Sequence, residues 1–225
     1  MAAKTTAPTK RPVPRIYLAT PPLGDGADAG DRLTGLLDAA DIAAVLLRLM
    51  PADDRSLIRH IKTLAPVIQQ RGIALLLDGH FDIVARAGAD GAHVSGIDAV
   101  NDALSALKPD RIVGAGGLAS RHDSMIAAEA GADYVLFGEP DQGGHRPKLE
   151  AIVERLSWWA EVFEPPCVAH AADLAEVGAL AATGADFILL DEFVWRDPRG
   201  PRQALTDAGQ AIATAMTSPV AENQA

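Results

Sequence analysis

The segment 131–138 reads GADYVLFG, and its opening tripeptide Gly-Ala-Asp opens two more apolar runs in the 225-residue chain. These begin at Gly88 (GADGAHV) and Gly184 (GADFILLD), and a weaker copy, AADIAAVLL, covers residues 39–47. Glycine suits the end of a helix, because a positive φ is cheap only without a Cβ atom. The apolar run that follows each copy is typical of a parallel strand buried on both faces. The repeat therefore predicts a series of helix-to-strand junctions.

Four further apolar runs, at 16–19, 73–77, 111–115 and 167–169, complete eight predicted strands. Between the runs, apolar residues spaced three and four apart predict helices at 54–70, 121–130, 149–162 and 173–182. Strand and helix thus alternate eight times, and no glycine-rich turn follows the first strand. This order favours an α/β fold with a single (β/α)₈ TIM barrel over an open doubly wound sheet.

The composition limits the domain organisation and the partners. Hydrophobic residues make up 48% of the chain and aromatic residues only 4%, so the core is expected to be aliphatic. We expect one barrel over residues 15–217, a disordered N-terminal tail at 1–14 and a frayed C-terminal tail at 218–225. The net charge of −10 argues against a nucleic-acid partner, which needs a basic face.

The cysteine count and the hydropathy point to a cellular setting. Cys167 is the single cysteine, so no intrachain disulfide forms and a reducing cytoplasm is the expected location. The sequence has no uncharged apolar run of about 18 residues or more, so we expect no membrane span. The adjacent tryptophans Trp158 and Trp159 point about 100° apart on a helix, and an exposed one would suggest contact with a second copy of the chain.

Polar residues follow the apolar runs, where a barrel of this kind carries its active site. Read in order, these strand ends resemble the thiamine phosphate synthase family and its relative, the thiazole tautomerase. The most specific matches are RIYLAT at Arg15, ADGAHVSGID at Ala89, RIVGAG at Arg111 and GADYVLFG at Gly131. The resemblance implies a barrel that couples a pyrimidine diphosphate with a thiazole phosphate, with Mg²⁺ holding the pyrophosphate.

The resemblance also assigns ligand-binding positions. Of the family's Gln-x-Arg-x-Lys motif after the second strand, only Arg48 is present. Asp98 matches one metal-binding aspartate, and Asp78 lies one residue before the other, so both are candidate Mg²⁺ ligands. Gly116 stands at a family serine, and Lys148 lies two residues beyond the family's loop lysine. Because several family groups differ, the resemblance is to a divergent paralogue.

Further candidates come from residue chemistry at the strand ends. Glu139 stands where the tautomerase carries its proton-transferring histidine, and partial burial predicts a raised pKa and a proton-shuttling role. His80 and His170 lie at strand ends, where an imidazole is useful for acid–base chemistry, whereas His93 lies inside a strand pattern and is expected to face inward. The candidates are Glu139, Lys148 and His80 for catalysis, Arg48, Asp78, His93, Gly116, Gly138 and His170 for substrate binding, and Asp98 and Asp78 for metal.

Each of these interpretations has a structural alternative. Asp98 equally suits the N-cap of a helix beginning near Ala99. Arg48 is equally expected to pair with Asp78 or Asp53, and Glu139 to be a solvated loop residue.

At the phosphate end, the family's Gly-Gly turn is replaced by His170-Ala171-Ala172, and a serine by the pair Asp191-Glu192. Methyl groups and facing carboxylates predict that phosphate does not bind there.

Three functions remain open on the sequence alone. The first is the thiamine phosphate synthase reaction on small heterocyclic substrates. The second is a metal-independent, tautomerase-like acid–base reaction with Glu139 or His80 as the proton carrier. The third is a non-catalytic barrel that binds a small ligand, so whether the chain is an enzyme stays undecided.

Overall fold

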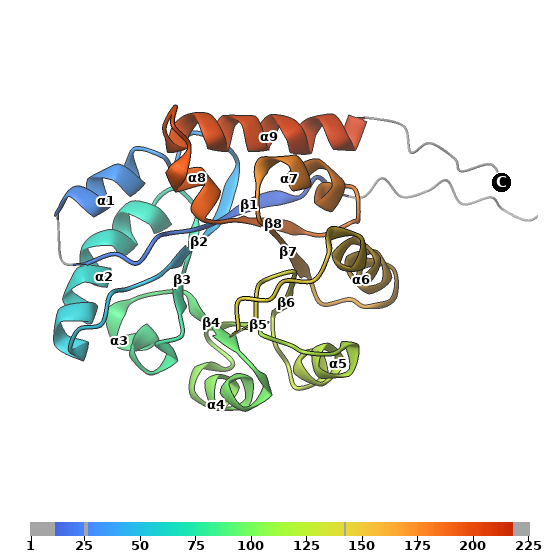
Figure 1. Ribbon diagram of the computed structural model, residues 1–225. Helices are drawn as coiled ribbons and strands as arrows, with labels where there is room; N and C mark the ends of the chain where they lie inside the picture. The colour runs from blue at the N-terminus through green and yellow to red at the C-terminus, as the bar shows by residue number, and fades with distance from the viewer. Residues whose placement is uncertain (1–11, 25–26, 142, 218–225) are drawn as a thin grey trace, which may run out of the picture.

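The fold is a closed barrel of eight parallel strands in the order β1 to β8, surrounded by helices (Figure 1). The computed structural model describes residues 12–24, 27–141 and 143–217. The predicted (β/α)₈ barrel is therefore confirmed. Strand β1 begins at Arg15 and helix α9 ends at Thr217. Residues 1–11 and 218–225 lie outside the described residues, so the two tails stay predictions.

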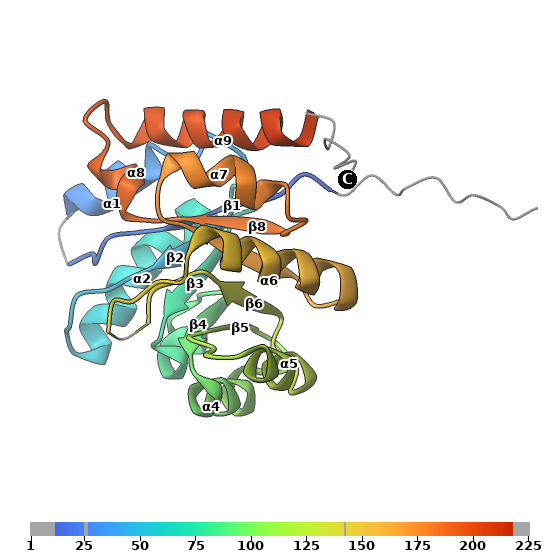
Figure 2. The ribbon, with the colours of Figure 1, turned by 45° about the vertical axis from the view of Figure 1, so that its right-hand side comes forward.

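The strands are β1 (Arg15–Ala19), β2 (Ile42–Leu47), β3 (Ala74–Asp78), β4 (Gly91–Ser95), β5 (Ile112–Gly116), β6 (Tyr134–Phe137), β7 (Cys167–Ala171) and β8 (Phe187–Leu190). The helices are α1 (Ala27–Thr34), α2 (Asp54–Gln69), the 3₁₀ turn η1 (Phe81–Ile83), α3 (Val84–Ala87), α4 (Ile97–Leu107), α5 (Arg121–Glu129), α6 (Leu149–Val162), α7 (Leu174–Ala181), α8 (Glu192–Arg196) and α9 (Pro201–Thr217). Helices α8 and α9 follow the last strand, and α9 lies alongside α7 (Figure 2).

Apolar side chains form two separate layers. The larger cluster fills the space between the strands and the helices. The smaller one fills the inside of the barrel and consists of Tyr17, Ala19, Leu46, Leu76, Tyr134, Leu136, Val168 and Leu189. Because neighbouring residues of a strand point to opposite faces, β1, β2, β3, β6, β7 and β8 each contribute buried side chains to both layers. Tyr17 and Tyr134 bring the only hydroxyl groups into this inner cluster.

The glycines of the repeat lie where the sequence places them, at the ends of helices. Gly88, Gly131 and Gly184 have φ values of 79°, 106° and 93°. An L-residue with a Cβ atom rarely adopts this left-handed conformation. The predicted role of the repeat in ending each helix before a strand is thus confirmed. It also explains why β4 begins only at Gly91, since Gly88 still caps α3.

The aspartates of the repeat have a role that sequence analysis did not foresee. Each carboxylate accepts a hydrogen bond from a backbone N–H at the start of the preceding strand. The bonds are Leu75 N to Asp90 Oδ2 (2.7 Å), Val113 N to Asp133 Oδ2 (2.7 Å) and Cys167 N to Asp186 Oδ2 (2.8 Å). The repeat therefore ties β4, β6 and β8 to the strands before them.

Replacing Asp186 by alanine is expected to lower the free energy of unfolding by about 2 kcal/mol, because a charge-assisted bond to the buried Cys167 N–H is lost. Urea unfolding measures the change. The control is Asp102→Ala at an exposed position of α4, with an expected change within about 0.5 kcal/mol. Equal losses in the two variants would contradict this role for the repeat.

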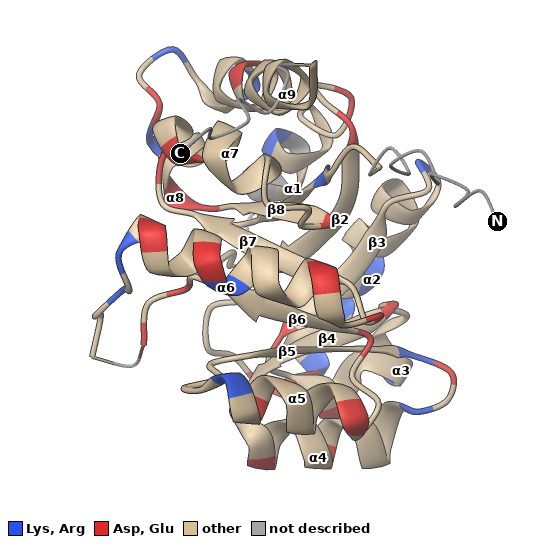
Figure 3. Cartoon of the chain, turned by 90° about the vertical axis from the view of Figure 1, so that its right-hand side faces the viewer, with Lys and Arg blue, Asp and Glu red and all other residues tan. Residues whose placement is uncertain are grey.

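The outer surface carries acidic and basic residues in mixture. Figure 3 shows Asp and Glu positions along α4, α5 and α6, with Lys and Arg scattered among them on this face. Within the described part of the chain, no helix is both long and apolar enough to cross a membrane. Trp159 is fully buried and stacks on Phe163, whereas Trp158 is half-buried beneath the guanidinium of Arg121.

Candidate functional site

The candidate residues gather at one rim of the barrel, because all eight strands are parallel and their carboxyl ends meet there. Asp78 ends β3, and His93 and His170 lie in β4 and β7. Arg48 directly follows β2, and Glu139 follows β6 by two residues. The predicted parallel barrel, in which each candidate follows or ends a strand, therefore already predicts that these side chains meet at one rim.

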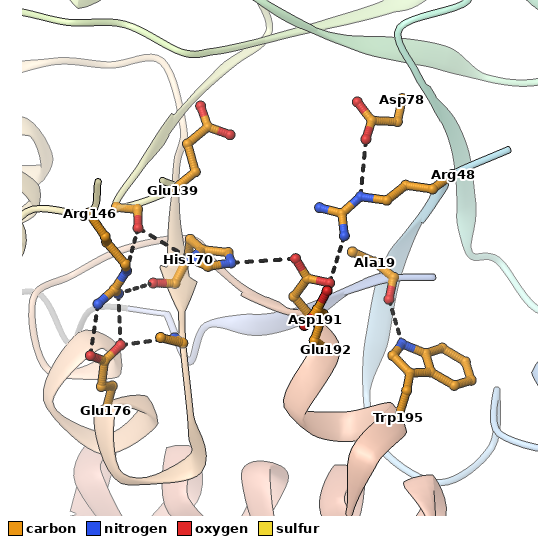
Figure 4. Close-up of polar contacts among 12 residues, drawn as sticks. Ala19, Arg48, Asp78, Glu139, Arg146, His170, Glu176, Asp191, Glu192 and Trp195 are labelled. Atoms are coloured by element: carbon orange, nitrogen blue, oxygen red, sulfur yellow. Dashed lines mark hydrogen bonds and ion pairs between the residues drawn. The ribbon is translucent and has the colours of Figure 1, made fainter. Parts of the chain in front are cut away.

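Arg48 lies between two carboxylates (Figure 4). Its Nε donates to Asp78 Oδ2 at 3.1 Å, and its Nη1 donates to Asp191 Oδ1 at 2.6 Å. The other oxygen of Asp191 lies 3.6 Å from His170 Nε2. Burial alone would raise the pKa of Asp191, but His170 and Arg48 outweigh it and hold that pKa below its usual value. The charge of Arg48 is thus already matched, and an anionic ligand must displace a carboxylate to reach it.

A second charged group, Arg146, braces the loop that follows β6. Its guanidinium donates to Gly138 O (2.6 Å) and His170 O (2.9 Å), and it makes two bonds of 2.9 and 2.7 Å to the Glu176 carboxylate. Glu176 also accepts from Ala172 N at 2.9 Å (Figure 4). Arg146 therefore joins the ends of β6 and β7 to the first half of α7. Only about one sixth of either charged side chain is exposed, at 17% and 14%.

Glu139 is fixed next to His93. One oxygen of its carboxylate accepts a hydrogen bond from Gly117 N, and the other lies 3.9 Å from His93 Nε2. Burial would raise the pKa of Glu139, but His93, the Gly117 amide and His170 together lower it below the usual value. The predicted raised pKa is wrong, and so is the alternative of a solvated loop residue, because its side chain is only 24% exposed.

Strand β5 supplies the room that these side chains need. A Cβ atom on Gly114 would overlap the ring of Tyr134, and one on Gly116 would overlap both His93 Nε2 and Glu139 Oε1. Gly114 and Gly116 are two residues apart on the strand, so both face the same side. The glycines of the RIVGAG motif thus leave room for the side chains of the neighbouring strands.

A cavity of about 570 Å³ opens beside Glu139. Its lining comes from the end of β4, from the loops after β4, β5 and β6, and from α6, and includes Ser95, Gly96, Gly117, Gly138, Glu139 and Arg155. This size suits a small ligand. The cavity places Glu139 at the boundary between the barrel interior and the space that a ligand would occupy.

Three candidates lie apart from this cluster. His80 follows β3 with a left-handed backbone (φ 32°), and Lys148 is an exposed residue at the start of α6. The structure gives neither side chain a contact with the rim residues described above. Asp98 is the second residue of α4, whose N-cap is Gly96, so the predicted N-cap role for Asp98 is wrong. Helix α4 starts two residues earlier than the predicted position near Ala99.

The candidate magnesium ligands do not form a finished metal site. Asp78 is engaged by Arg48, and Asp98 is exposed on α4. Among the residues that the structure describes, no group of three His, Cys, Asp or Glu side chains could hold a metal ion. The expected alternative pairing of Arg48 with Asp78 is present, while Asp53 instead caps α2 by accepting from Ser56 N.

The predicted pair of carboxylates facing the phosphate position needs correction. Asp191 points into the rim, but Glu192 is 63% exposed and pairs with Arg196 one turn along α8. Residue 192 is the first of a helix, so its side chain is directed away from that of Asp191. The carboxylate that occupies the turn after β7 is Glu176, bound to Ala172 N. Sequence analysis missed Glu176 because it lies inside a predicted helix.

Comparison with known proteins agrees with these motifs. A sequence model described as thiamine monophosphate synthase matches residues 16–191. A protein named thiamine-phosphate synthase from Rhodospirillum centenum is 41% identical over 201 residues, covering 88% of this chain and 97% of that protein. A protein of the same name from Hyphomonas neptunium is 34% identical, covering 87% and 92%.

Solved structures show the same fold. Thiamine phosphate pyrophosphorylase from Pyrococcus furiosus superposes with a TM-score of 0.74 at 21% identity, over 89% of this chain and 96% of that one. A 3-hexulose-6-phosphate synthase from Salmonella typhimurium has a TM-score of 0.66 at 16% identity, over 89% and 99%. Two different synthases thus share the barrel, and the sequence matches decide between them. The chain belongs to the thiamine monophosphate synthase family.

Proposed function

We propose that the chain is an enzyme of thiamine biosynthesis that couples a pyrimidine diphosphate with a thiazole phosphate at this rim. The observation that carries the proposal is the match to proteins named thiamine-phosphate synthase over 97% and 92% of their length. The rim supports it with the half-buried Arg48, two buried histidines, and Glu139, which lines a cavity of about 570 Å³.

In this proposal the rim residues bind and orient the two rings. Arg48 is the group for the diphosphate, and it exchanges a bond to Asp78 or Asp191 for one to the ligand. Glu139 holds a polar atom of a ring in the cavity, His93 acts on that ring through Glu139, and Gly116 leaves the space for both side chains. Gly138 lines the cavity, and His170 Nδ1 lies 3.2 Å from its carbonyl oxygen. Catalytic roles for His80 and Lys148 remain proposals, which His80→Ala and Lys148→Ala test directly.

Magnesium is the cofactor that the resemblance implies. Asp78 and Asp98 are its proposed ligands, but they form no finished site here, so we assign no step to the metal. Turnover with and without added Mg²⁺, and after chelation, measures the requirement. The variant Asp98→Ala separates a role in metal binding from a role in stability. Because Asp98 is exposed, its replacement is expected to change stability little, so a loss of Mg²⁺-dependent turnover would report metal binding.

The decisive experiment combines turnover with calorimetry. Thiazole phosphate, pyrimidine diphosphate and thiamine phosphate are titrated with and without Mg²⁺, and thiamine phosphate formation is followed by chromatography. Product formation that is lost in Arg48→Ala supports the synthase reaction. Binding of the heterocycles without any product would instead support the non-catalytic barrel and overturn the proposal.

The fixed carboxylate of Glu139 supports a second candidate, proton transfer on a related heterocycle. Its lowered pKa keeps Glu139 ionised near neutral pH, so it would begin as a base. Metal-independent exchange of a ring proton in D₂O, lost in Glu139→Gln, would identify this reaction. Exchange that persists in Glu139→Gln would exclude Glu139 as the proton carrier.

The Asp191→Asn variant is expected to bind inorganic pyrophosphate about fivefold more tightly than the parent chain, because a carboxylate no longer competes for Arg48. Calorimetry without metal measures the affinity. The control is Glu192→Gln, which removes the same charge from the next residue, paired with Arg196. Equal gains in both variants would show that overall charge, and not release of Arg48, controls anion binding.

The composition supports further proposals about partners and location. We propose that the protein acts in the cytoplasm, since its one cysteine is a buried thiol whose pKa is raised to about 12 by burial and by Asp186. The net charge of −10 supports the absence of a nucleic-acid partner. The half-buried Trp158 is the proposed point of contact in a homo-oligomer.

A further inference from the structure

A file of polar groups runs through the inside of the barrel to the rim. The hydroxyls of Tyr17 and Tyr134 lie 2.9 Å apart, and the Tyr134 hydroxyl lies 3.0 Å from His93 Nδ1. The far nitrogen of the same ring, Nε2, points toward Glu139. Tyr17, Tyr134 and His93 are 2%, 6% and 2% exposed. The file therefore connects the aliphatic interior with the cavity beside Glu139.

One atom of this file lacks a hydrogen bond. His93 Nε2 is buried and has no hydrogen-bond partner among the described residues, since Glu139 Oε2 is 3.9 Å away. Buried polar atoms in folded proteins are nearly always paired, so an unpaired one requires an explanation. A Cβ atom on Gly116 would overlap both this nitrogen and Glu139 Oε1, so glycine is what lets the imidazole and the carboxylate approach each other. The group that His93 Nε2 faces is thus Glu139, which lines the cavity.

Which proton His93 carries follows from its neighbours. A lone pair on Nε2 would face the ionised Glu139 carboxylate and repel it, whereas an N–H would be attracted. If Nε2 bears the proton, Nδ1 of the neutral ring is an acceptor, so the Tyr134 hydroxyl must donate to it. Tyr134 is then free to accept from Tyr17. Both hydrogen bonds then run in one direction, toward the rim, and the Nε2–H points on toward Glu139.

The two tyrosines are suited to donating hydrogen bonds toward His93. Burial raises the pKa of both hydroxyls well above the usual value, so they stay neutral donors. The rings of Tyr134 and His93 stack at 5.7 Å with an angle of 7° between their planes. Tyr17 meets Tyr134 edge-on at 5.9 Å. The imidazole is thus held by packing as well as by the hydrogen bond.

We propose that Tyr134, supported by Tyr17, is a positioning residue that holds His93 as the Nε2–H tautomer. His93 then directs its N–H at the carboxylate of Glu139, which lines the cavity and is the base at the rim. The inference rests on the proposed function only in taking the cavity beside Glu139 as the ligand site.

The test is ¹⁵N NMR of the histidine rings in the free full-length chain near neutral pH. The His93 signals are assigned by their loss in His93→Gln. We expect a protonated Nε2 and an unprotonated Nδ1 in the parent chain. In Tyr134→Phe, which keeps the ring, we expect a mixture of tautomers, and in Tyr17→Phe a smaller change. No substrate is needed, so the result is independent of which reaction the chain performs.

Two spectroscopic outcomes would overturn the inference. One is a parent chain with the proton on Nδ1 or on both nitrogens. The other is an unchanged His93 spectrum in a folded Tyr134→Phe. Where turnover is measurable, Tyr134→Phe is expected to lower kcat about tenfold, the effect of one hydrogen bond. A matching loss in Tyr17→Phe with unchanged ¹⁵N shifts would point to packing alone, and would also overturn it.

Discussion

Gly114→Ala is expected to lower the free energy of unfolding by about 3 kcal/mol, the upper part of the range for overpacking a core. The added methyl group would overlap the ring of Tyr134, which faces β5 inside the barrel. The ring has no room to retreat, because Tyr17 meets it edge-on and His93 stacks on it. Urea unfolding followed by circular dichroism measures the loss.

The matched control is Gly178→Ala in α7, where an added Cβ atom meets nothing within 4 Å. This change should raise stability by about 0.5–1 kcal/mol, the gain in helix propensity from glycine to alanine. The double variant Gly114→Ala/Tyr134→Leu should lose less than the sum of its two single changes, because the smaller side chain relieves the overlap. Additive losses would show that the ring is not what Gly114 accommodates.

The barrel was predictable because each copy of the repeat predicts a helix end followed by a strand. Both features depend on residues next to each other in the sequence: a glycine that adopts a positive φ, as Gly131 and Gly184 do, and the apolar run that follows it. The aspartate of the repeat was not assigned, since its partner is a strand that precedes it by about 15 to 20 residues, as with Asp133 and Val113. The role of this aspartate depends on which strands lie next to each other, and this neighbour relation is known only once the closed barrel is known.

The rim was predictable as a set of positions, but the contacts within it were not. Arg48 and Asp191 are 143 residues apart in the sequence, and Tyr17 and Tyr134 are 117 apart. Side-chain pairing at such distances is set by tertiary packing, which no local pattern records. The pKa of Glu139 was predicted in the wrong direction for the same reason. Burial was anticipated, but the Gly117 amide and His93 outweigh it.

Arg146→Met is expected to destabilise the chain by about 3 kcal/mol, the lower end of the range for breaking a buried ion pair. The methionine keeps most of the side-chain volume but removes both hydrogen bonds from Arg146 to the Glu176 carboxylate. Of the hydrogen bonds to this carboxylate described above, only the one from Ala172 N–H remains. Gly138 O and His170 O lose donors as well. Thermal and urea unfolding measure the change.

The control is Arg86→Met, which removes an ion pair of similar length, 2.8 Å to Asp54, at a site more than half exposed. Exposed pairs contribute about 1 kcal/mol or less, so this variant separates burial from simple charge loss. Arg146→Met should also make the Gly143–Gly144 segment easier to cleave by protease, because Arg146 anchors that loop to β7. If the two variants lose equal stability and resist protease equally, Arg146 is a surface charge, and the fixed position of Glu139 beside Gly138 must have another cause.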